Sequence, residues 1–295
     1  MNEKKIFIQA NDKQYFGALL ARYAIDRFQP DGERIPIQII NTDDLPTFQA
    51  LHGKRYWLNR RRRYEKREFS LQDLQSFTLS RFMPPQLMQY QGRSLVIDPD
   101  VFALKDPRPI FDFDLKGASI AAVTNARGKP ASSVMFMDCS KLKHWKIERI
   151  LENLFSGVIV YRELMALQGE SVTALPDEWN HHDKLEPETR MLHCTAKLTQ
   201  PWKTGLPIDF RLRGKRVRLL NTLPSSWAQW LRPVLRVPLK FQPHPIKLIE
   251  QTVLGLVAAA LQDGSISEAT VVKHIEAGHV RSDLLTKVRN QSNYG

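Results

Sequence analysis

The sequence predicts an α/β fold whose sheet is mostly parallel. Two observations indicate this: the chain starts with a strand, helix, strand pattern, and several apolar runs end in polar turn residues. A strand, a helix and a strand in succession favour parallel pairing through a right-handed crossover. With 295 residues, 42% of them hydrophobic, the chain can bury one sizeable core.

The first predicted elements are a strand, a helix and a second strand. Residues 4–9 form an apolar run typical of a buried strand, and Asn11 and Asp12 can cap a helix over residues 15–28. Residues 35–40 predict the second strand, which ends in a polar turn.

Three further strands are predicted at residues 93–97, 119–124 and 133–138. The first of these ends directly at Asp98-Pro99-Asp100. Because ligands collect beyond the carboxyl ends of strands in open α/β sheets, polar residues at such strand ends are candidates for a binding site.

The last part of the chain differs in composition. After Trp202 it is rich in Pro, Arg and Trp, which predicts irregular structure. Helices are then predicted at residues 246–262, 267–277 and 282–288. We therefore divide the sequence into residues 1–205 and a basic C-terminal extension, residues 206–295, that is irregular and then helical.

Positive charge dominates, with a formal net charge of +12 and two basic clusters at residues 54–67 and 211–218. Such fields attract polyanions, so nucleic acid, anionic lipid and a phosphorylated substrate all fit, and so does a solvated face without a partner. Trp227, Trp230 and Leu231 near the second cluster fit attachment to an anionic membrane, and equally a packed core.

Cysteine usage and hydropathy favour a cytoplasmic protein. Cys139 and Cys194 lack the spacing of zinc ligands or of a disulfide framework, so we expect reduced thiols. The apolar run at residues 6–8 is too short for a signal peptide, and the longest apolar stretch, residues 253–261, falls short of the roughly 20 residues that span a bilayer. We expect a protein that touches the inner face of the membrane only peripherally, if at all.

Asp98-Pro99-Asp100 is the first candidate for chemistry. Two aspartates separated by one residue can hold a hard divalent cation that bridges the phosphates of a diphosphate. The same spacing recurs at Asp112 and Asp114, where the alternating phenylalanines indicate packing. The first copy is preferred because it follows an apolar strand, although a simple strand-ending turn would look the same.

A neutral imidazole is a common third ligand beside two carboxylates. His193 follows a short apolar segment that can anchor it, whereas His181 and His182 are adjacent and their side chains diverge. From the residues alone, His193 fits both a metal ligand and an ordinary polar residue.

Several segments in a fixed order complete the pattern. They are residues 6–12 with Tyr15 and residues 17–19, Arg81 within residues 80–84, residues 94–101, residues 175–180, Leu192-His193 and Pro201-Trp202. Over about residues 4–205 this combination resembles glycosyltransferase family 8, which contains glycogenin and bacterial lipopolysaccharide hexosyltransferases. The ordered combination is more specific than any one motif.

The resemblance implies a glycosyltransferase A-type fold, with a Rossmann-like mixed sheet flanked by helices, and makes residues 1–205 the nucleotide-sugar-binding and catalytic domain. It implies a retaining hexosyltransferase that moves a hexose from a UDP-sugar to a glycan, lipid-linked or protein acceptor. It also implies Mn²⁺ or Mg²⁺ held by Asp98, Asp100 and His193. The donor-binding residues would be Ala10, Asn11, Asp12, Tyr15, Arg81, Asp98, Pro99 and Asp100, and the acceptor-side residues Trp179, Asn180 and Asp183. Tyr15 fits stacking on uracil and simple packing equally well.

The sequence departs from the family pattern on the sugar-binding side. Gln200 replaces the family lysine before Pro-Trp, so Lys197 or Lys203 would have to supply the positive charge at the diphosphate. Residues 131–133 read Ala-Ser-Ser where relatives have Asn-Ser-Gly, and residues 161–163 read Tyr-Arg-Glu in place of an Asp-Gln pair. The donor hexose and the efficiency of transfer therefore stay open. Asp183 and Glu163 are candidates to orient the acceptor hydroxyl or the sugar, and surface carboxylates are the alternative for both.

Two other functions compete. A nucleic-acid-binding protein is favoured by the charge, but the sequence contains no recognisable reading helix, aromatic ribonucleoprotein motif or zinc pattern, so nucleic acid is not the favoured partner. A metal-dependent phosphoesterase would use the same carboxylates. The acceptor, the hexose and the oligomeric state cannot be read from the sequence.

Overall fold

The computed structural model describes residues 3–30, 32, 34–59, 65–194, 198–208 and 240–292. Some residues singled out in the sequence lie outside these ranges: the middle of the first basic cluster, all of the second, Lys197, Trp227, Trp230 and Leu231.

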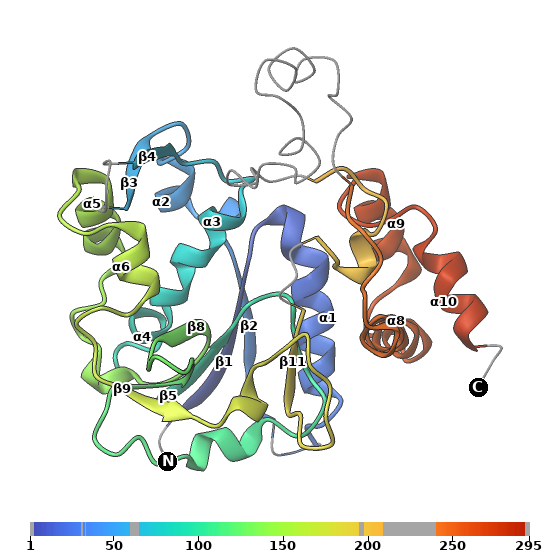
Figure 1. Ribbon diagram of the computed structural model, residues 1–295, viewed down its shortest axis with the longest axis horizontal. Coiled ribbons are helices and arrows are strands. Elements are labelled where there is room, and N and C mark those ends of the chain that lie inside the picture. Colours follow the sequence, from blue (N-terminus) through green and yellow to red (C-terminus); the bar gives the residue numbers. More distant parts are fainter. Residues whose placement is uncertain are drawn as a thin grey trace, which may run out of the picture.

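Within the described residues the central sheet has six strands in the order β2-β1-β5-β8-β7-β9 (Figure 1). Their bounds are β1 Lys4–Ala10, β2 Ile37–Asn41, β5 Arg93–Ile97, β7 Ile120–Thr124, β8 Pro130–Asp138 and β9 Val172–Leu175. β1 pairs in parallel with both β2 and β5, and β7 pairs in parallel with β9. Strand β8 is antiparallel to β5 and β7. The predicted α/β fold with a mixed, mostly parallel sheet is confirmed.

Helices and loops cover both faces of this sheet (Figure 1). The side chains of β1 alternate between two hydrophobic clusters. Ile6 and Ile8 pack with helices α1 (Tyr15–Asp26) and α8 (Lys247–Gln262), and Phe7 packs with α5 (Ile147–Ser156). Besides α5, the α-helices on the side of Phe7 have four or five residues each: α2 Pro46–Gln49, α3 Leu74–Phe77, α4 Pro84–Leu87 and α6 Tyr161–Met165. Because both faces are buried, the central strands read as continuous apolar runs, which is why the sequence revealed them.

Helix α1 (Tyr15–Asp26) connects the first two strands, as predicted. Asn11 caps the short 3-10 turn before it by accepting a hydrogen bond from the Gln14 backbone N–H. Gly17 lies against the turn that follows β5, where an added Cβ would stand 2.7 Å from the Pro99 carbonyl oxygen. Glycine at this position therefore brings the start of α1 against the Asp98-Pro99-Asp100 turn.

A second, small sheet lies beside that turn. Its strands are β6 (Val101–Ala103), β11 (Met191–His193) and β10 (His181–His182), with β11 in the middle. β11 runs antiparallel to β6 and parallel to β10, and the register pairs His193 with both Val101 and His182. This pairing brings residue 193 next to residue 100.

Other elements were not predicted. A hairpin is formed by β3 (Arg55–Asn59) and β4 (Glu65–Glu68) within the first basic cluster. Short 3-10 turns occur at Asp12–Gln14, Thr42–Asp44, Thr78–Phe82, Arg108–Asp112, Cys139–Lys141, Asp177–Trp179 and Pro201–Lys203.

The C-terminal region is helical, as predicted, with α8 (Lys247–Gln262), α9 (Glu268–Glu276) and α10 (Leu284–Ser292). Helix α8 contributes Ile249, Val253 and Val257 to the same hydrophobic cluster as α1. Figure 1 shows these helices stacked outside α1 on one side of the sheet. The division of the chain at residue 205 remains a prediction.

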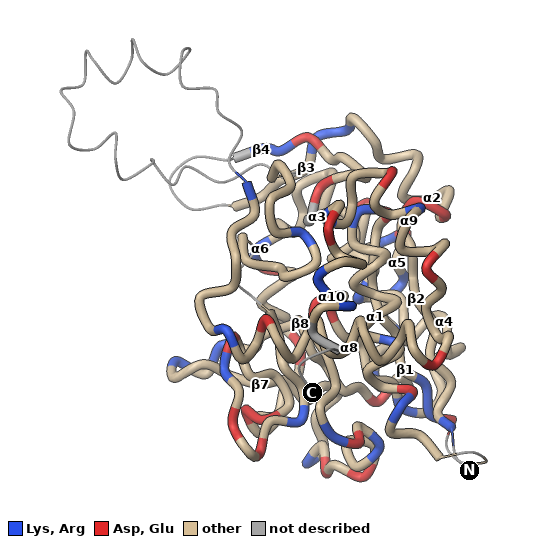
Figure 2. The backbone as a smooth tube through the Cα atoms, turned by 90° about the vertical axis from the view of Figure 1, so that its right-hand side faces the viewer, with Lys and Arg blue, Asp and Glu red and all other residues tan. Residues whose placement is uncertain are grey.

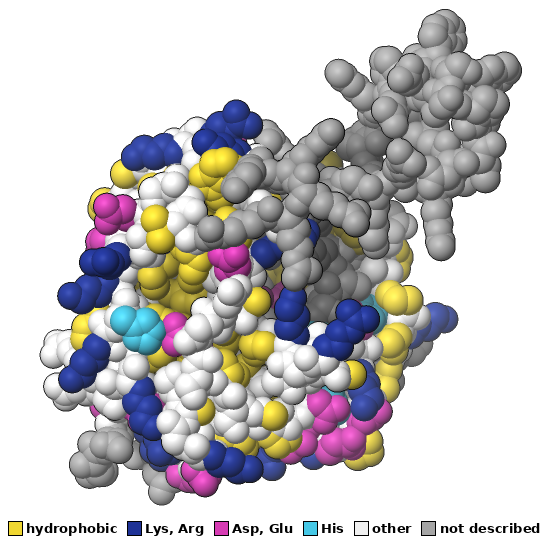
Figure 3. Space-filling model, turned by 60° about the vertical axis from the view of Figure 1, so that its left-hand side comes forward, with side chains coloured by type: hydrophobic (Ala, Val, Ile, Leu, Met, Phe, Trp, Pro, Cys, Tyr) yellow, Lys and Arg dark blue, Asp and Glu magenta, His cyan; other side chains and the backbone are white. Residues whose placement is uncertain are grey.

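Charged residues of both signs are interspersed along the described backbone (Figure 2). On the face drawn in Figure 3, Lys and Arg side chains are likewise scattered, with acidic side chains among them, and do not gather in one patch. Every helix in the described ranges is too short or too polar to cross a lipid bilayer.

Candidate metal centre

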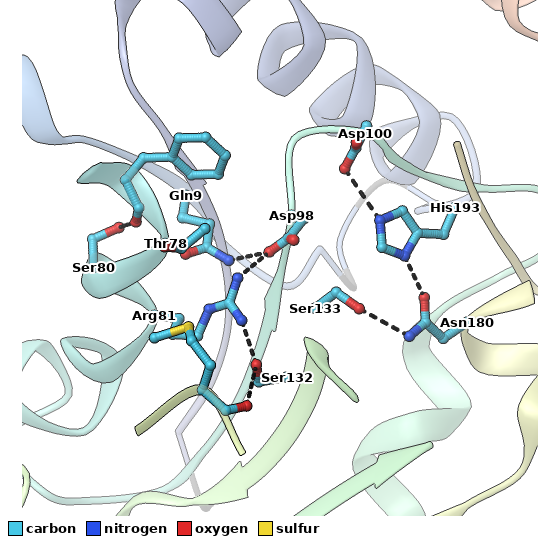
Figure 4. A network of polar contacts seen from close by, with 12 residues as sticks. Gln9, Thr78, Ser80, Arg81, Asp98, Asp100, Ser132, Ser133, Asn180 and His193 are labelled. Carbon is cyan, nitrogen blue, oxygen red and sulfur yellow. Dashed lines mark hydrogen bonds and ion pairs between the residues drawn. The ribbon is translucent and has the colours of Figure 1, made fainter. Parts of the chain in front are cut away.

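Asp98, Asp100 and His193 each offer a ligand atom, and these atoms all lie within 4.8 Å of one another. The turn that carries both aspartates is fixed by backbone bonds: the Asp98 N–H donates to Ser133 O at 2.9 Å, and the Cys194 N–H donates to Asp100 O at 3.0 Å. The carboxyl end of β5 and the small sheet thus bring together side chains that are distant in sequence (Figure 4).

Two side-chain donors hold the Asp98 carboxylate in place (Figure 4). Its Oδ1 accepts from the Gln9 side-chain amide and, at 2.9 Å, from the Arg81 guanidinium. Arg81 also donates to Ser132 Oγ, which in turn donates to the Met165 carbonyl at 3.0 Å. Burial raises the pKa of the Asp98 carboxyl above its ordinary value, and the Arg81 charge opposes that rise only in part.

Asp100 faces His193. The His193 Nε2 lies 3.4 Å from Asp100 Oδ1, and the Gln200 amide donates to Asp100 Oδ2 at 3.1 Å. Burial by itself raises the pKa of Asp100, but His193 and the Gln200 hydrogen bond outweigh burial and hold this pKa below its ordinary value. Burial lowers the pKa of His193, and the attraction to Asp100 and then to Asp98 more than reverses this, so the His193 pKa is raised.

The orientation of His193 is fixed by a hydrogen bond at the ring nitrogen that does not face Asp100. Its Nδ1 lies 2.9 Å from the Asn180 Oδ1, and the Asn180 Nδ2 donates to Ser133 Oγ at 3.0 Å (Figure 4). An amide oxygen can only accept, so Nδ1 carries a hydrogen. In the neutral ring the lone pair then lies on Nε2, the atom that faces Asp100. An imidazole held in this way by an outer partner is the usual arrangement of a metal-ligating histidine.

These three side chains fit Mn²⁺ or Mg²⁺. Carboxylate oxygens suit both ions, and an imidazole nitrogen is also accepted by a transition metal such as Mn²⁺. One other group among the described residues has ligand atoms as close together, formed by His181, Glu186 and Glu188. There the Lys184 ammonium already lies 2.7 Å from Glu186, so a lysine supplies the positive charge.

No protein-family model matches this chain, and no curated protein matches it. Among solved structures it is similar to the bifunctional glycosyltransferase WbbM, at 14% identity and a TM-score of 0.49, covering 69% of this chain and 47% of that one. It is also similar to the glycosyltransferase GlyE of Streptococcus pneumoniae TIGR4, at 17% identity and a TM-score of 0.48, covering 81% of this chain and 66% of that one.

A third similar structure is the galactosyltransferase LgtC in complex with donor and acceptor sugar analogs, at 15% identity and a TM-score of 0.44, covering 77% of this chain and 99% of that one. This chain thus spans less than two thirds of the length of the first two proteins. Likeness at this level assigns no activity, so the function has to be inferred from this chain's own side chains.

Two of the predicted donor-binding residues lie in a separate pocket. Asp12 and Tyr15 line a space of about 480 Å³ between the start of α1, the end of β2 and helix α9. The Tyr15 ring is stacked on His274 of α9, with centroids 6.3 Å apart. Ala10 is fully buried at the end of β1, and Asn11 uses its side-chain amide to donate to the Leu71 carbonyl at 2.8 Å.

The predicted acceptor-side residues are divided. Asn180 contacts His193, as described, whereas Trp179 is buried and stacks against Arg190, with the guanidinium 5.0 Å from the ring. The Asp183 N–H donates to the His193 carbonyl at 2.9 Å, which places Asp183 beside the centre.

The structure also describes the positions of Lys203, Glu163 and the second Asp-x-Asp copy. Lys203 is fully buried, with its ammonium 5.5 Å from the Phe241 ring centre. Glu163 accepts from the Val160 N–H at 3.3 Å at the start of helix α6. The second Asp-x-Asp copy is separate from the centre, and its Asp112 side chain is 82% exposed.

The sequence did not indicate Gln9 or His244 as residues of the site. Gln9 is a fully buried polar residue near the end of an apolar strand, and a polar side chain at that position was the only available signal. His244 lies between two prolines and contacts Asp183. Both contacts join segments that are far apart in the sequence, so no local pattern predicts them.

Proposed function

We propose that the protein is a retaining hexosyltransferase that uses a UDP-sugar donor and holds Mn²⁺ or Mg²⁺ through Asp98, Asp100 and His193. The observation that carries the proposal is the convergence of these three side chains at one point, with an outer partner for each. The ordered motifs of the sequence that resemble glycosyltransferase family 8 include all three ligands.

When bound, the cation would neutralise the negative charge that develops on the diphosphate as the glycosidic bond breaks. The chain's own residues prepare for this. Arg81 and Gln9 fix the Asp98 carboxylate, Gln200 fixes Asp100, and Asn180 orients His193. Because the outer partners hold the ligands in place before the donor arrives, little reorganisation is needed at the moment of reaction.

The pocket at Asp12 and Tyr15 is proposed to receive the nucleoside of the donor. It begins three residues beyond Gln9, whose side chain contacts Asp98, so one extended ligand could occupy both places. Its volume of about 480 Å³ is within the usual range of small-molecule pockets. Ala10, Asn11 and Pro99 would shape the path between the pocket and the cation.

The acceptor is proposed to enter on the side of Trp179, Asn180 and Asp183. An acceptor hydroxyl held there near the anomeric carbon would react mainly because it is well positioned. Asp183 is the proposed carboxylate that orients the acceptor hydroxyl or the sugar, and Glu163 is the second candidate. Lys197 or Lys203 would add positive charge at the diphosphate. The basic residues would favour an acceptor that carries phosphate or lies in an anionic membrane.

Titration with a panel of UDP-sugars, with and without Mn²⁺, tests the proposal. We expect calorimetric binding that requires the metal, and transfer to an acceptor without bulk release of free hexose. Asp100→Asn should weaken Mn²⁺-dependent binding, whereas Asp112→Asn, in the exposed second copy of the motif, should bind as the natural chain does.

Two outcomes would contradict the proposal. Hydrolysis of phosphoesters without transfer would identify a phosphoesterase built on the same carboxylates. Tight, salt-sensitive binding of nucleic acid, with no effect of UDP-sugars, would identify a nucleic-acid-binding protein.

A further inference from the structure

Asp183 and His244 make a partly buried contact beside the metal centre. The His244 Nε2 lies 3.1 Å from Asp183 Oδ1, and the His244 side chain has no exposed surface while that of Asp183 keeps 24%. An ionised carboxylate can only accept, so Nε2 carries the hydrogen and donates it to Asp183. The imidazole therefore supports the carboxylate from the protein interior.

The second ring nitrogen of His244 is bonded to the backbone. The His244 Nδ1 lies 3.1 Å from both the backbone nitrogen and the carbonyl oxygen of Ile246, so this ring nitrogen contacts the same backbone unit whether it accepts or donates. Ile246 is the residue immediately before α8. His244 therefore links the start of α8 to Asp183.

The backbone around His244 is restricted. Pro243 and Pro245 fix their own φ angles, and each keeps the residue before it out of the helical region. The chain just before them is held by two backbone bonds, Gln242 N–H to Leu198 O at 2.7 Å and Phe241 N–H to Leu206 O at 2.9 Å. His244 is therefore presented by a rigid segment.

The backbone of Asp183 is also unusual. Its φ of 46° lies in the left-handed region, which Asp and Asn tolerate better than most residues. Its N–H donates to the His193 carbonyl, directly after the register that pairs His182 with His193. The backbone bond sets where Asp183 lies relative to the metal centre, and His244 sets where the carboxylate points.

We propose that His244 is a positioning residue that holds the Asp183 carboxylate in the orientation needed for the acceptor hydroxyl. The C-terminal part of the chain thereby takes part in glycosyl transfer. This role rests on the proposed function, in which Asp183 orients the acceptor.

Steady-state kinetics of two substitutions test this role. His244→Leu removes the donor at similar size, and we expect kcat/KM for the acceptor to fall roughly 10- to 100-fold, because misplacing an orienting group by about 1 Å has effects of this order. The KM for the UDP-sugar and the Mn²⁺ requirement should stay unchanged. His244→Gln places an amide donor near the position of Nε2 and should recover most of the loss.

A double-mutant comparison separates positioning from general damage to the fold. Asn at position 183 suits the left-handed backbone there, so Asp183→Asn is used as the background. In that background, adding His244→Leu should lower kcat/KM for the acceptor by less than about a further twofold. An equal loss in both backgrounds, or a donor KM raised as much as the acceptor KM, would overturn the role. If His244→Leu unfolds at a lower temperature than the natural chain, the acceptor kcat/KM of His244→Gln is compared with that of the natural chain instead. Similar values support the role, and a large loss in His244→Gln overturns it. Absence of transfer by the natural chain would refute the proposed function itself, and with it this role.

Discussion

Asn180 determines which nitrogen of His193 faces the carboxylates. Because its amide oxygen takes the hydrogen on Nδ1, the lone pair of the neutral ring lies on Nε2. Asn180, which itself donates to Ser133, supports this imidazole through a hydrogen bond, and the His182 ring packs against it edge-on with the ring centroids 5.0 Å apart. The orientation of His193 therefore depends on a side chain that does not itself face Asp100.

Asn180→Ala should weaken metal binding although it leaves Asp98, Asp100 and His193, the three proposed ligands, unchanged. Loss of an outer partner typically reduces metal affinity about 10- to 100-fold, and we expect a Mn²⁺ affinity lower by that order. Titration calorimetry with Mn²⁺ measures this. Asn153→Ala on helix α5 is the matched control and should bind Mn²⁺ like the natural chain. Equal affinities for all three proteins would show that Asn180 does not support a metal-binding imidazole.

Arg81 is the countercharge of a buried carboxylate, with side-chain exposures of 5% and 16% for Arg81 and Asp98. Arg81→Met leaves Asp98 without a cation, and breaking a buried pair in this way costs about 3–5 kcal/mol of unfolding free energy. The double substitution Arg81→Met with Asp98→Asn should regain part of that loss, because no unpaired charge remains. Chemical denaturation at neutral pH measures both. A double variant no more stable than the single one would contradict this account.

At the scale of elements, the packing of α1 depends on Gly17. Gly17→Ala should destabilise the protein by about 1–3 kcal/mol, because the new methyl group would overlap the Pro99 carbonyl. Gly255→Ala in α8 meets no atom within 4 Å, and should stabilise the protein by about 0.5–1 kcal/mol through better helix propensity. Denaturant unfolding of the two variants measures both changes in unfolding free energy, which should have opposite signs. Equal effects would show that α1 does not press on the turn.

Helix α9 docks on α1 through a histidine that resists protonation. Burial first, and then His279 and Lys273, lower the pKa of His274 to about 4, while Asp12 acts weakly in the opposite direction. The unfolded chain, with an ordinary histidine pKa near 6.5, binds the proton more readily. Stability from this contact is therefore complete above about pH 6.5 and decreases as the pH falls toward 4.

His274→Phe should reduce this acid sensitivity, because phenylalanine keeps the stacking on Tyr15 and has no proton to gain. Thermal unfolding between pH 7 and pH 4.5 measures the effect. The natural chain should lose more melting temperature over this range than the variant does. Parallel curves for the two proteins would assign the acid sensitivity to other groups.

The elements that sequence patterns revealed are those buried on both faces or capped locally. Strand β5 and helices α1 and α8 fall within a few residues of prediction, because their apolar periodicity is strong. The strands of the small sheet are too short to show any period, and their pairing depends on contacts between distant segments. The β3–β4 hairpin was hidden because its charged residues read as a solvated cluster.

At the scale of the whole molecule, the C-terminal helices and the sheet share one core. Val253 of α8 is fully buried in the cluster that also holds Phe16 and Ile8, whereas Leu248 on the same helix is 56% exposed. Val253→Ala should cost about 1–3 kcal/mol, and Leu248→Ala should change stability by less than about 0.5 kcal/mol. A single unfolding transition in both variants, followed by tryptophan fluorescence and circular dichroism, would indicate one cooperative unit. Two transitions would separate the C-terminal helices from the rest.

The candidate site was predictable to the extent that its residues lie at strand ends or in motifs. Asp98 and Asp100 follow an apolar strand directly, and the resemblance to a known family, more than its own neighbours, selected His193. His244 could not be predicted, since only the folded chain brings a proline-flanked residue from the C-terminal part against Asp183. The pocket that is proposed to receive the nucleoside likewise includes residues of α9, a contribution that neither composition nor motif indicates.

The small sheet has a consequence for how such proteins diversify. His182 and His193 are held in register by neighbouring strands, while residues 184–188 between them are exposed or half-buried. That connection can be exchanged for one of another length or chemistry while both strands stay in place. Under the proposed function, replacing this one loop would change which acceptor is bound without altering the neighbouring residues 98, 100 and 193.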